Sequence, residues 1–189
     1  IRQVLYPVPE HLKFELLQRL LADASLDSVL VFARTRHRAD RLVRDLQRAG
    51  ISAAVIHGER SQSQRIAALE AFRRGRTRVL VATDIAARGI DVEGISHVVN
   101  YDVPMQPEDY VHRIGRTGRA TAAGHAYTLA TPGDARMVHR IEYILQHKIE
   151  RRQVEGLDYS APSVRIPSAE EIRRYVEANR HRPSVAPGV

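Results

Sequence analysis

Cysteine is absent from this sequence, lysine occurs at only two positions, and aromatic residues make up 5% of the chain. The lack of cysteine excludes disulfide bonds and thiolate metal sites, and it fits a cytoplasmic protein. The low aromatic content argues against base stacking as the main way of binding a single strand. No apolar run reaches the roughly 18 residues that a membrane span needs, so we expect no contact with a membrane.

Two elements of phosphate chemistry are also missing. No Gly-Lys dipeptide occurs, so the chain has no phosphate-binding P-loop. No Asp-Glu pair follows an expected strand, where it would hold Mg²⁺. The histidines do not have metal-ligand spacing with carboxylates nearby, and we therefore predict no metal site in this chain.

The charge of the chain is strongly basic. It has 29 basic and 22 acidic residues, a net charge of +7, and a pI near 10.2. All the basic residues except Lys13 and Lys148 are arginines. Guanidinium groups form paired hydrogen bonds with phosphate oxygens, so this composition favours a nucleic-acid partner. Genome composition or growth temperature can also produce an arginine bias, and charge alone is therefore not specific.

Short apolar segments alternate with amphipathic ones along most of the chain. We expect strands at residues 3–7, 28–33, 52–56, 78–83, 96–100 and 126–131. We expect helices at residues 10–24, 36–47, 61–72, 107–114 and 133–146. This alternation predicts an α/β fold with an open parallel β-sheet flanked by helices on both faces. Ligands of such sheets bind beyond the carboxyl ends of the strands.

The periodicity breaks down after Glu150. We therefore expect one domain over residues 1–150, followed by a linker and helical extension over residues 151–189. Ser168 and Glu171 have the spacing of a capping box, which predicts a helix from residue 169 to about residue 179. The extension can begin a further domain for dimerisation or nucleic-acid binding, or it can pack on the first domain. Because residue 1 is Ile, we expect the chain to be part of a longer protein.

The segment Tyr110–Arg119 contains three arginines spaced three residues apart. Gly115 and Gly118 lie between them and allow a ligand to approach the backbone closely. Neighbouring guanidinium groups repel one another unless an anion lies among them. An arginine directed at a γ-phosphate accelerates phosphoryl transfer by roughly 10³–10⁵. The alternative interpretation is a solvated basic turn.

The segment Val81–Asp91 combines a strand with a polar loop. Thr83 and the loop amides can bind a nucleic-acid phosphate, and Asp91 can accept hydrogen bonds from ribose hydroxyls. The alternative for Asp91 is a helix cap or turn residue, which is commoner for an isolated aspartate.

Two further loops follow expected strands. Thr35 and Arg36 come directly after one strand, within reach of a phosphate. Ser61 is the expected first cap of a helix whose free amides attract an anion, and Gln62 and Arg65 lie on one face of that helix. A solvated helix start is the alternative for Ser61, Gln62 and Arg65.

The run His112–Arg119 resembles the last motif of the DEAD-box RNA helicases, which belong to superfamily 2. The resemblance extends from about Val4 to Leu145 and implies the C-terminal RecA-like domain of such a helicase. It implies ATP and RNA as ligands, and an N-terminal RecA-like domain of the same protein that carries the P-loop and holds Mg²⁺. The chain alone is then expected not to hydrolyse ATP.

The resemblance also implies roles for individual residues. The catalytic residues that reach the γ-phosphate are Arg116 and Arg119. Nucleotide contacts come from Gly89, Asp91, Arg116 and Arg119. RNA contacts come from Thr35, Arg36, Gly58, Gln62, Arg65, Thr83 and Asp84. Coupling between the two domains is expected from Arg88, His112 and Arg113.

Two other classes of function stay open from the sequence. A DNA-directed superfamily 2 translocase shares this domain plan, although its arginine motif usually departs from the eight residues found here. A non-catalytic nucleic-acid-binding or oligomerisation module with decayed motifs is the second, although every polar motif position is filled. A homodimer formed through the C-terminal extension is also possible.

Overall fold

The structure is a computed structural model that describes residues 1–118, 123–163, 170, 173–174 and 177. The chain divides into two compact units, Ile1–Tyr159 and Ser160–Val189. The expected boundary at residue 150 therefore falls inside the first unit. The reason is a short strand at Glu150–Arg151, which the sequence did not indicate and which pairs with the first strand of the chain.

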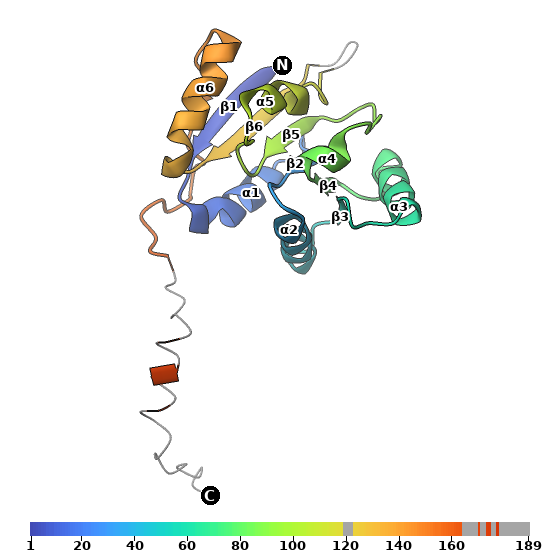
Figure 1. Ribbon diagram of the computed structural model, residues 1–189, viewed down its shortest axis with the longest axis horizontal. Coiled ribbons are helices and arrows are strands. Elements are labelled where there is room, and N and C mark those ends of the chain that lie inside the picture. The colour runs from blue at the N-terminus through green and yellow to red at the C-terminus, as the bar shows by residue number, and fades with distance from the viewer. Residues whose placement is uncertain (119–122, 164–169, 171–172, 175–176, 178–189) are drawn as a thin grey trace, which may run out of the picture. The chain divides into compact units, whose positions relative to one another are not determined.

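Within the described residues, seven strands form one sheet, and each strand runs parallel to its neighbours. The strands are β1 (Arg2–Pro7), β2 (Val29–Phe32), β3 (Ala53–Ile56), β4 (Val79–Ala82), β5 (His97–Asn100), β6 (His125–Ala130) and β7 (Glu150–Arg151). Their order across the sheet is β3-β4-β2-β5-β6-β1-β7 (Figure 1). Every residue of β2, β4 and β5 is buried, as expected of strands that are covered on both faces.

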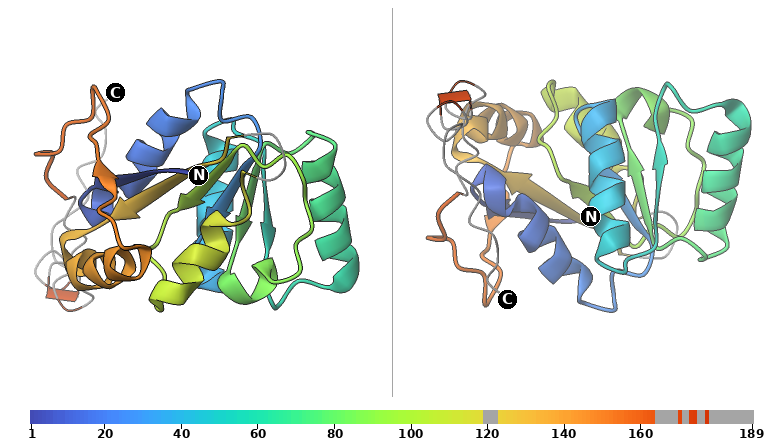
Figure 2. Two further views of the ribbon diagram at one scale, coloured as in Figure 1. Left: turned by 90° about the horizontal axis from the view of Figure 1, so that it is seen from above. Right: turned by 90° about the horizontal axis from the view of Figure 1, so that it is seen from below.

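Helices cover both faces of the sheet, which confirms the predicted fold class. The helices are α1 (Lys13–Leu21), α2 (Arg36–Arg48), α3 (Gln62–Arg73), α4 (Asp84–Ala87), α5 (Pro107–Ile114) and α6 (Ala135–Leu145). Two 3-10 turns, η1 (Glu10–Leu12) and η2 (Pro132–Asp134), precede α1 and α6. Figure 2 shows α1 and α2 on one face of the sheet, with α5 and α6 on the opposite face.

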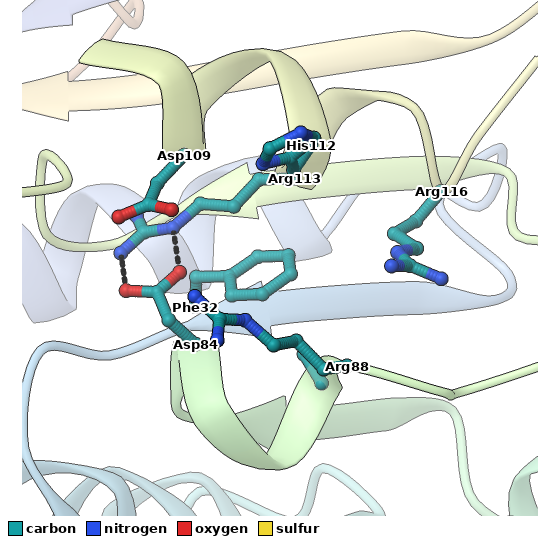
Figure 3. A pocket seen from close by; sticks show the side chains of 8 residues that line it. Phe32, Asp84, Arg88, Asp109, His112, Arg113 and Arg116 are labelled. Atoms are coloured by element: carbon teal, nitrogen blue, oxygen red, sulfur yellow. Dashed lines mark hydrogen bonds and ion pairs between the residues drawn. The ribbon is translucent and has the colours of Figure 1, made fainter. Parts of the chain in front are cut away.

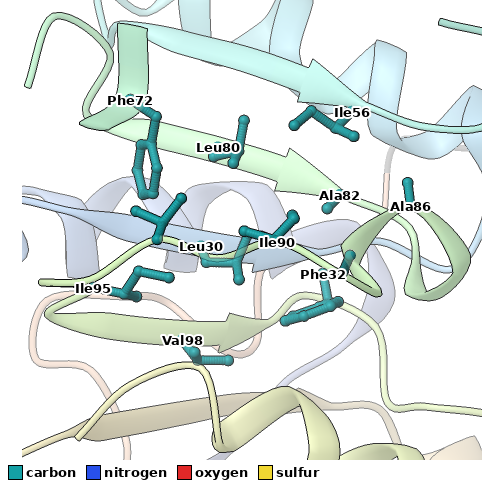
Figure 4. Close-up of a cluster of buried hydrophobic side chains, with 12 residues drawn as sticks. Leu30, Phe32, Ile56, Phe72, Leu80, Ala82, Ala86, Ile90, Ile95 and Val98 are labelled. Carbon is teal, nitrogen blue, oxygen red and sulfur yellow. The ribbon is translucent and has the colours of Figure 1, made fainter. Parts of the chain in front are cut away.

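A buried cluster joins β2 and β4 to the segment that follows β4. Leu30 and Phe32 of β2 pack with Leu80 of β4, and Ala86 of α4 and Ile90 of the next loop close the cluster (Figure 4). Side chains this tightly packed do not reorganise freely, so the loop after β4 is held on the sheet. This packing fixes the base of the candidate site.

Several local expectations differ from the structure. The four residues of α4 were expected to be loop. In the helix expected at residues 133–146, the apolar Ile144 is 40% exposed, whereas the charged Glu142 is buried. The predicted capping box of Ser168 and Glu171 lies outside the described residues. Glu170, Arg173, Arg174 and Glu177 are helical, in the region where that helix was expected.

No helix in the described part of the chain is long and apolar enough to cross a membrane.

Candidate functional site

The loops that carry the predicted residues meet at one edge of the sheet. Since β2, β3, β4 and β5 run parallel, their carboxyl ends point to the same edge. The loop after β2 holds Thr35 and Arg36, the loop after β3 holds Gly58, and Thr83 and Asp84 follow β4. The sheet therefore brings together segments that are far apart in the sequence.

A cavity of about 260 Å³ lies at this edge (Figure 3). Five of the predicted residues line it: Asp84, Arg88, His112, Arg113 and Arg116. The remaining lining residues are Phe32, Ala87 and Asp109. Phe32 is 1% exposed, and its ring forms part of the wall. The cavity wall thus combines guanidinium, imidazole and carboxylate groups with one aromatic ring.

Arg113 is fully engaged inside this domain. Its Nε and Nη2 atoms donate to the two carboxylate oxygens of Asp84, each at 2.6 Å. Its Nη1 atom donates to Asn100 Oδ1 at 3.1 Å and to the Asp102 carbonyl at 2.7 Å. The guanidinium also lies 4.9 Å from the centre of the Phe32 ring. The charged groups of Asp84 and Arg113, which we expected to meet RNA and the other domain, therefore bind each other, and their assigned roles stay predictions.

Arg116 is held differently. It is half-buried, and its Nη1 atom donates to the Ile90 carbonyl at 3.1 Å. It has no carboxylate partner among the residues that the structure describes. Arg88 and His112 are exposed residues that line the same cavity. Arg119, the second predicted catalytic arginine, lies outside the described residues.

The loop after α4 carries the two predicted nucleotide contacts. Gly89 has φ +82°, a left-handed conformation that side chains rarely adopt, so glycine permits the turn. Asp91 is exposed, and its carbonyl accepts a 2.6 Å hydrogen bond from Arg73 Nη2. Gly89 and Asp91 do not line the cavity, but Arg116 contacts Ile90 between them.

The loops after β2 and β3 are joined by an ion pair. Thr35 Oγ1 caps α2 by accepting from the Arg38 amide at 3.2 Å. Arg36 Nη1 lies 2.8 Å from Glu59 Oε1 in the loop after β3. Thr35, Arg36 and Gly58 are exposed, so they form an accessible surface at this edge.

A buried histidine fixes the loop after β3. His57 is 3% exposed; its Nδ1 atom accepts from the Glu59 amide at 3.2 Å, so the proton lies on Nε2. Nε2 then donates to Asp40 Oδ1 on α2, at 2.9 Å. A Cβ added at Gly58 would meet nothing within 4 Å, so there is open space beside this backbone.

The start of α3 confirms the predicted cap. Ser61 Oγ accepts from the Gln64 amide and Gln64 Oε1 accepts from the Ser61 amide, which forms a capping box. Gln62 is exposed, and Arg65 is half-buried with Nη2 3.5 Å from the Ala86 carbonyl. Thr83, by contrast, is only 8% exposed, so its hydroxyl offers little surface to a ligand.

A buried carboxylate at the end of β5 was not identified from the sequence. Asp102 is 3% exposed and contacts Lys13, which is 2% exposed, at 3.2 Å. Burial by itself raises the pKa of Asp102, but hydrogen bonds from Arg38 and from the Arg34 amide, with the charge of Lys13, lower it overall. Its partners lie 64 to 89 residues away in sequence, so no local pattern could reveal them.

Burial also raises the pKa of the neighbouring Tyr101, against the opposing effect of Arg38. The cationic groups of Lys13 and Arg38 lie 5.7 and 5.6 Å from the centre of its ring. Tyr101 therefore stays uncharged and contributes a ring to the same cluster. Among the described residues, no group of three or more His, Cys, Asp or Glu side chains is placed to hold a metal ion.

Comparisons with known proteins show which family the chain resembles. The model of the helicase conserved C-terminal domain family matches residues 12–121. The DEAD-box ATP-dependent RNA helicase CshA of Bacillus licheniformis is 43% identical over 95% of this chain and 37% of its own length. This chain thus spans little more than a third of that relative.

Solved structures show the same relationship. The Escherichia coli DEAD-box protein SrmB, crystallised with regulator of ribonuclease activity A, has a TM-score of 0.77 and 36% identity over 88% of this chain and 96% of that one. A DEAD-box protein from Methanococcus jannaschii has a TM-score of 0.75 and 39% identity over 80% of this chain and 42% of that one.

The fold and the arginine-lined cavity define a RecA-like helicase domain. The chain belongs to the helicase conserved C-terminal domain family, and within it to the DEAD-box RNA helicases.

Proposed function

We propose that this chain is the half of an ATP-dependent RNA helicase that completes the ATP site and holds the RNA backbone during local duplex unwinding. The observation that carries the proposal is the position of Arg116. It lines the cavity with Arg88 and His112, and no described carboxylate neutralises it. A guanidinium at the carboxyl edge of a parallel sheet that has no carboxylate partner among the described residues is suited to an incoming phosphate.

The donor set of the cavity fits the phosphates of ATP. Arg116, together with Arg119, would contact the γ-phosphate, and Asp91 would accept hydrogen bonds from the ribose. ATP would supply the phosphoryl group, and Mg²⁺ would be held by the N-terminal RecA-like domain. Because the chain has no P-loop, it would not hydrolyse ATP alone. Arg88 and His112 are exposed, as coupling to that domain requires.

The RNA strand would lie along the loops after β2, β3 and β4. Thr35, Arg36, Gly58 and Gln62 are exposed there. Contacts from such side chains and from backbone amides position a strand without reading its sequence. Binding should therefore weaken with salt and depend little on base order.

The proposal is tested by joining the chain to its N-terminal RecA-like domain. Arg116→Ala and Arg119→Ala should each lower RNA-stimulated ATP turnover by roughly 10³, the lower end for an arginine finger. RNA affinity should change little. Arg41→Ala is the matched control, because that side chain is 79% exposed on α2. Turnover that equals the wild-type value in both site variants would disprove the role.

The same protein separates RNA from DNA as the substrate. ATP turnover should rise when an RNA strand is added, and it should not rise with a DNA strand of the same sequence. An equal response to DNA would favour the DNA-directed translocase instead.

The extension after residue 159 is proposed as the place where a homodimer would form. Sedimentation of the chain with and without residues 160–189 tests that proposal, and the same oligomeric state in both proteins would refute it.

A further inference from the structure

The side chain of Asp102 is buried between the loop after β2, where RNA is proposed to bind, and the arginine motif of the nucleotide cavity. It follows β5 and is not among the residues that would touch ATP or RNA. Its carboxylate binds Arg34 and Arg38, and its backbone carbonyl binds Arg113. Asp102 thus contacts both the loop after β2 and the arginine motif.

The carboxylate holds the loop after β2. Asp102 Oδ2 accepts from the Arg34 amide at 2.9 Å and from Arg38 Nε at 2.8 Å. Asp102 Oδ1 accepts from Arg38 Nη2 at 2.7 Å. Arg34 and Arg38 lie on either side of Thr35 and Arg36 in the chain. A shift of these two residues under an RNA phosphate would therefore pull on the carboxylate.

The carbonyl of the same residue holds the arginine motif. Arg113 Nη1 donates to it at 2.7 Å, while the rest of that guanidinium binds Asp84 at the start of α4. Arg113 and Asp84 line the cavity beside Arg116. A movement of the Asp102 backbone would thus reach the walls of the nucleotide cavity through one hydrogen bond.

A buried ion pair adds to the network. Lys13 Nζ lies 3.2 Å from Asp102 Oδ1, and both side chains are buried. Buried ionic groups that satisfy one another keep a unique arrangement, because any broken contact leaves an uncompensated charge. Such an element transmits displacement instead of absorbing it.

We propose that Asp102 is a positioning residue that couples RNA bound at Thr35 and Arg36 to the arginines of the nucleotide cavity. The inference rests on the proposed function. It predicts that Asp102 governs how strongly RNA stimulates ATP turnover, and that it has less influence on how tightly RNA binds.

The test uses the chain joined to its N-terminal RecA-like domain. The measured quantity is the ratio of ATP turnover at saturating RNA to turnover without RNA, with the half-saturating RNA concentration measured in the same titration. Asp102→Asn should lower the ratio by about tenfold, within the 5–150-fold range typical of coupled sites. The half-saturating RNA concentration should change by less than about threefold. A purely structural defect would lower both turnover values together and leave the ratio unchanged.

Arg38→Met is the second variant, because Arg38 is only partly buried and Asp102 keeps its contact with Lys13. Asp45→Asn is the matched control, since its pairs with Arg41 and Arg48 lie on the exposed face of α2. A wild-type ratio in Arg38→Met, or in a folded Asp102→Asn protein, overturns the proposal. If Asp102→Asn fails to fold, Arg38→Met decides alone. A wild-type protein that RNA does not stimulate would instead refute the proposed function.

Discussion

Asp84 and Arg113 form a two-point ion pair in which both guanidinium-to-carboxylate distances are 2.6 Å. The pair joins α4 to α5 across the cavity wall, and Arg113 is 2% exposed. Paired geometry of this kind is specific to arginine, because lysine has no planar fork. The pair therefore determines the shape of the cavity in addition to its charge.

Removing the carboxylate should destabilise the domain. Asp84→Asn leaves the buried Arg113 without its ion-pair partner, and we expect the free energy of unfolding to fall by about 3 kcal/mol. Asp45→Asn, in exposed pairs of 3.6 and 3.8 Å, should change it by less than about 0.5 kcal/mol. Urea denaturation of the three proteins measures the difference. Equal losses in the two variants would show that the pair contributes no more than a surface contact.

A close backbone contact closes the arginine motif. A Cβ added at Gly124 would lie 2.6 Å from the Gly118 Cα atom and 2.8 Å from the Thr117 carbonyl carbon. Gly124→Ala should therefore lower stability by roughly 1–3 kcal/mol, the usual cost of overpacking. Gly133→Ala is the control, because its nearest contact would be an ordinary 3.6 Å. Thermal melting of both variants provides the comparison, and equal melting temperatures would refute the clash.

The capping box of α3 gives a third prediction. Ser61→Ala removes the acceptor for the Gln64 amide and should cost about 1 kcal/mol of stability. Ser61→Asp restores an acceptor at the same position and should recover most of the loss. Denaturant midpoints of the three proteins measure this. A Ser61→Asp protein as unstable as Ser61→Ala would mean that the cap is not the cause.

Glu142 gives a prediction about pH. Burial by itself raises its pKa, but hydrogen bonds from Arg151, the Ile149 amide and Lys148 lower it from 4.5 to about 2. A carboxyl whose pKa is lowered by folding stabilises the native state above the unfolded pKa, and this contribution is lost as pH falls toward the folded pKa. Glu142 therefore loses its stabilising contribution as the pH falls from 4.5 to about 2.

Glu142→Gln should lower stability at pH 7 by about 2 kcal/mol, the size of hydrogen bonds to a charged group. The wild type and the variant should approach each other as the pH falls from 4.5 toward 2. Glu70→Gln, in an exposed helical pair with Arg74, should show no such convergence. Unfolding curves at successive pH values test this, and a constant difference down to pH 2 would contradict the assignment.

The elements with strong local signals were predictable from the sequence. Helix α5 begins and ends where the pattern predicted, because Pro107 suits a first helical turn and Gly115 follows its end. Ser61 was identified as a cap because a serine at the start of a helical segment is a preferred N-cap. Helix α4 and strand β7 were missed, since four and two residues are too short to show a period.

The residues of the site were predictable from the sequence, but the hydrogen bonds and ion pairs between them were not. The motifs placed Arg113, Arg116 and Asp84 at one edge, and the structure brings all three to one cavity. Their partners depend on long-range packing, so the sequence did not show that Asp84 neutralises Arg113 while no carboxylate among the described residues neutralises Arg116. The same limit applies to Asp102 and Lys13, whose contact spans 89 residues.

The position of β1 has a consequence for how the domain is assembled. Although β1 is first in the sequence, its two partners are β6 and β7, at residues 125–130 and 150–151. During synthesis from the N-terminus, β1 must wait unpaired until most of the domain has been made. Such distant pairing slows folding and exposes an apolar strand in the meantime. A chain ending before residue 125 would hold a strand with no neighbour on either side.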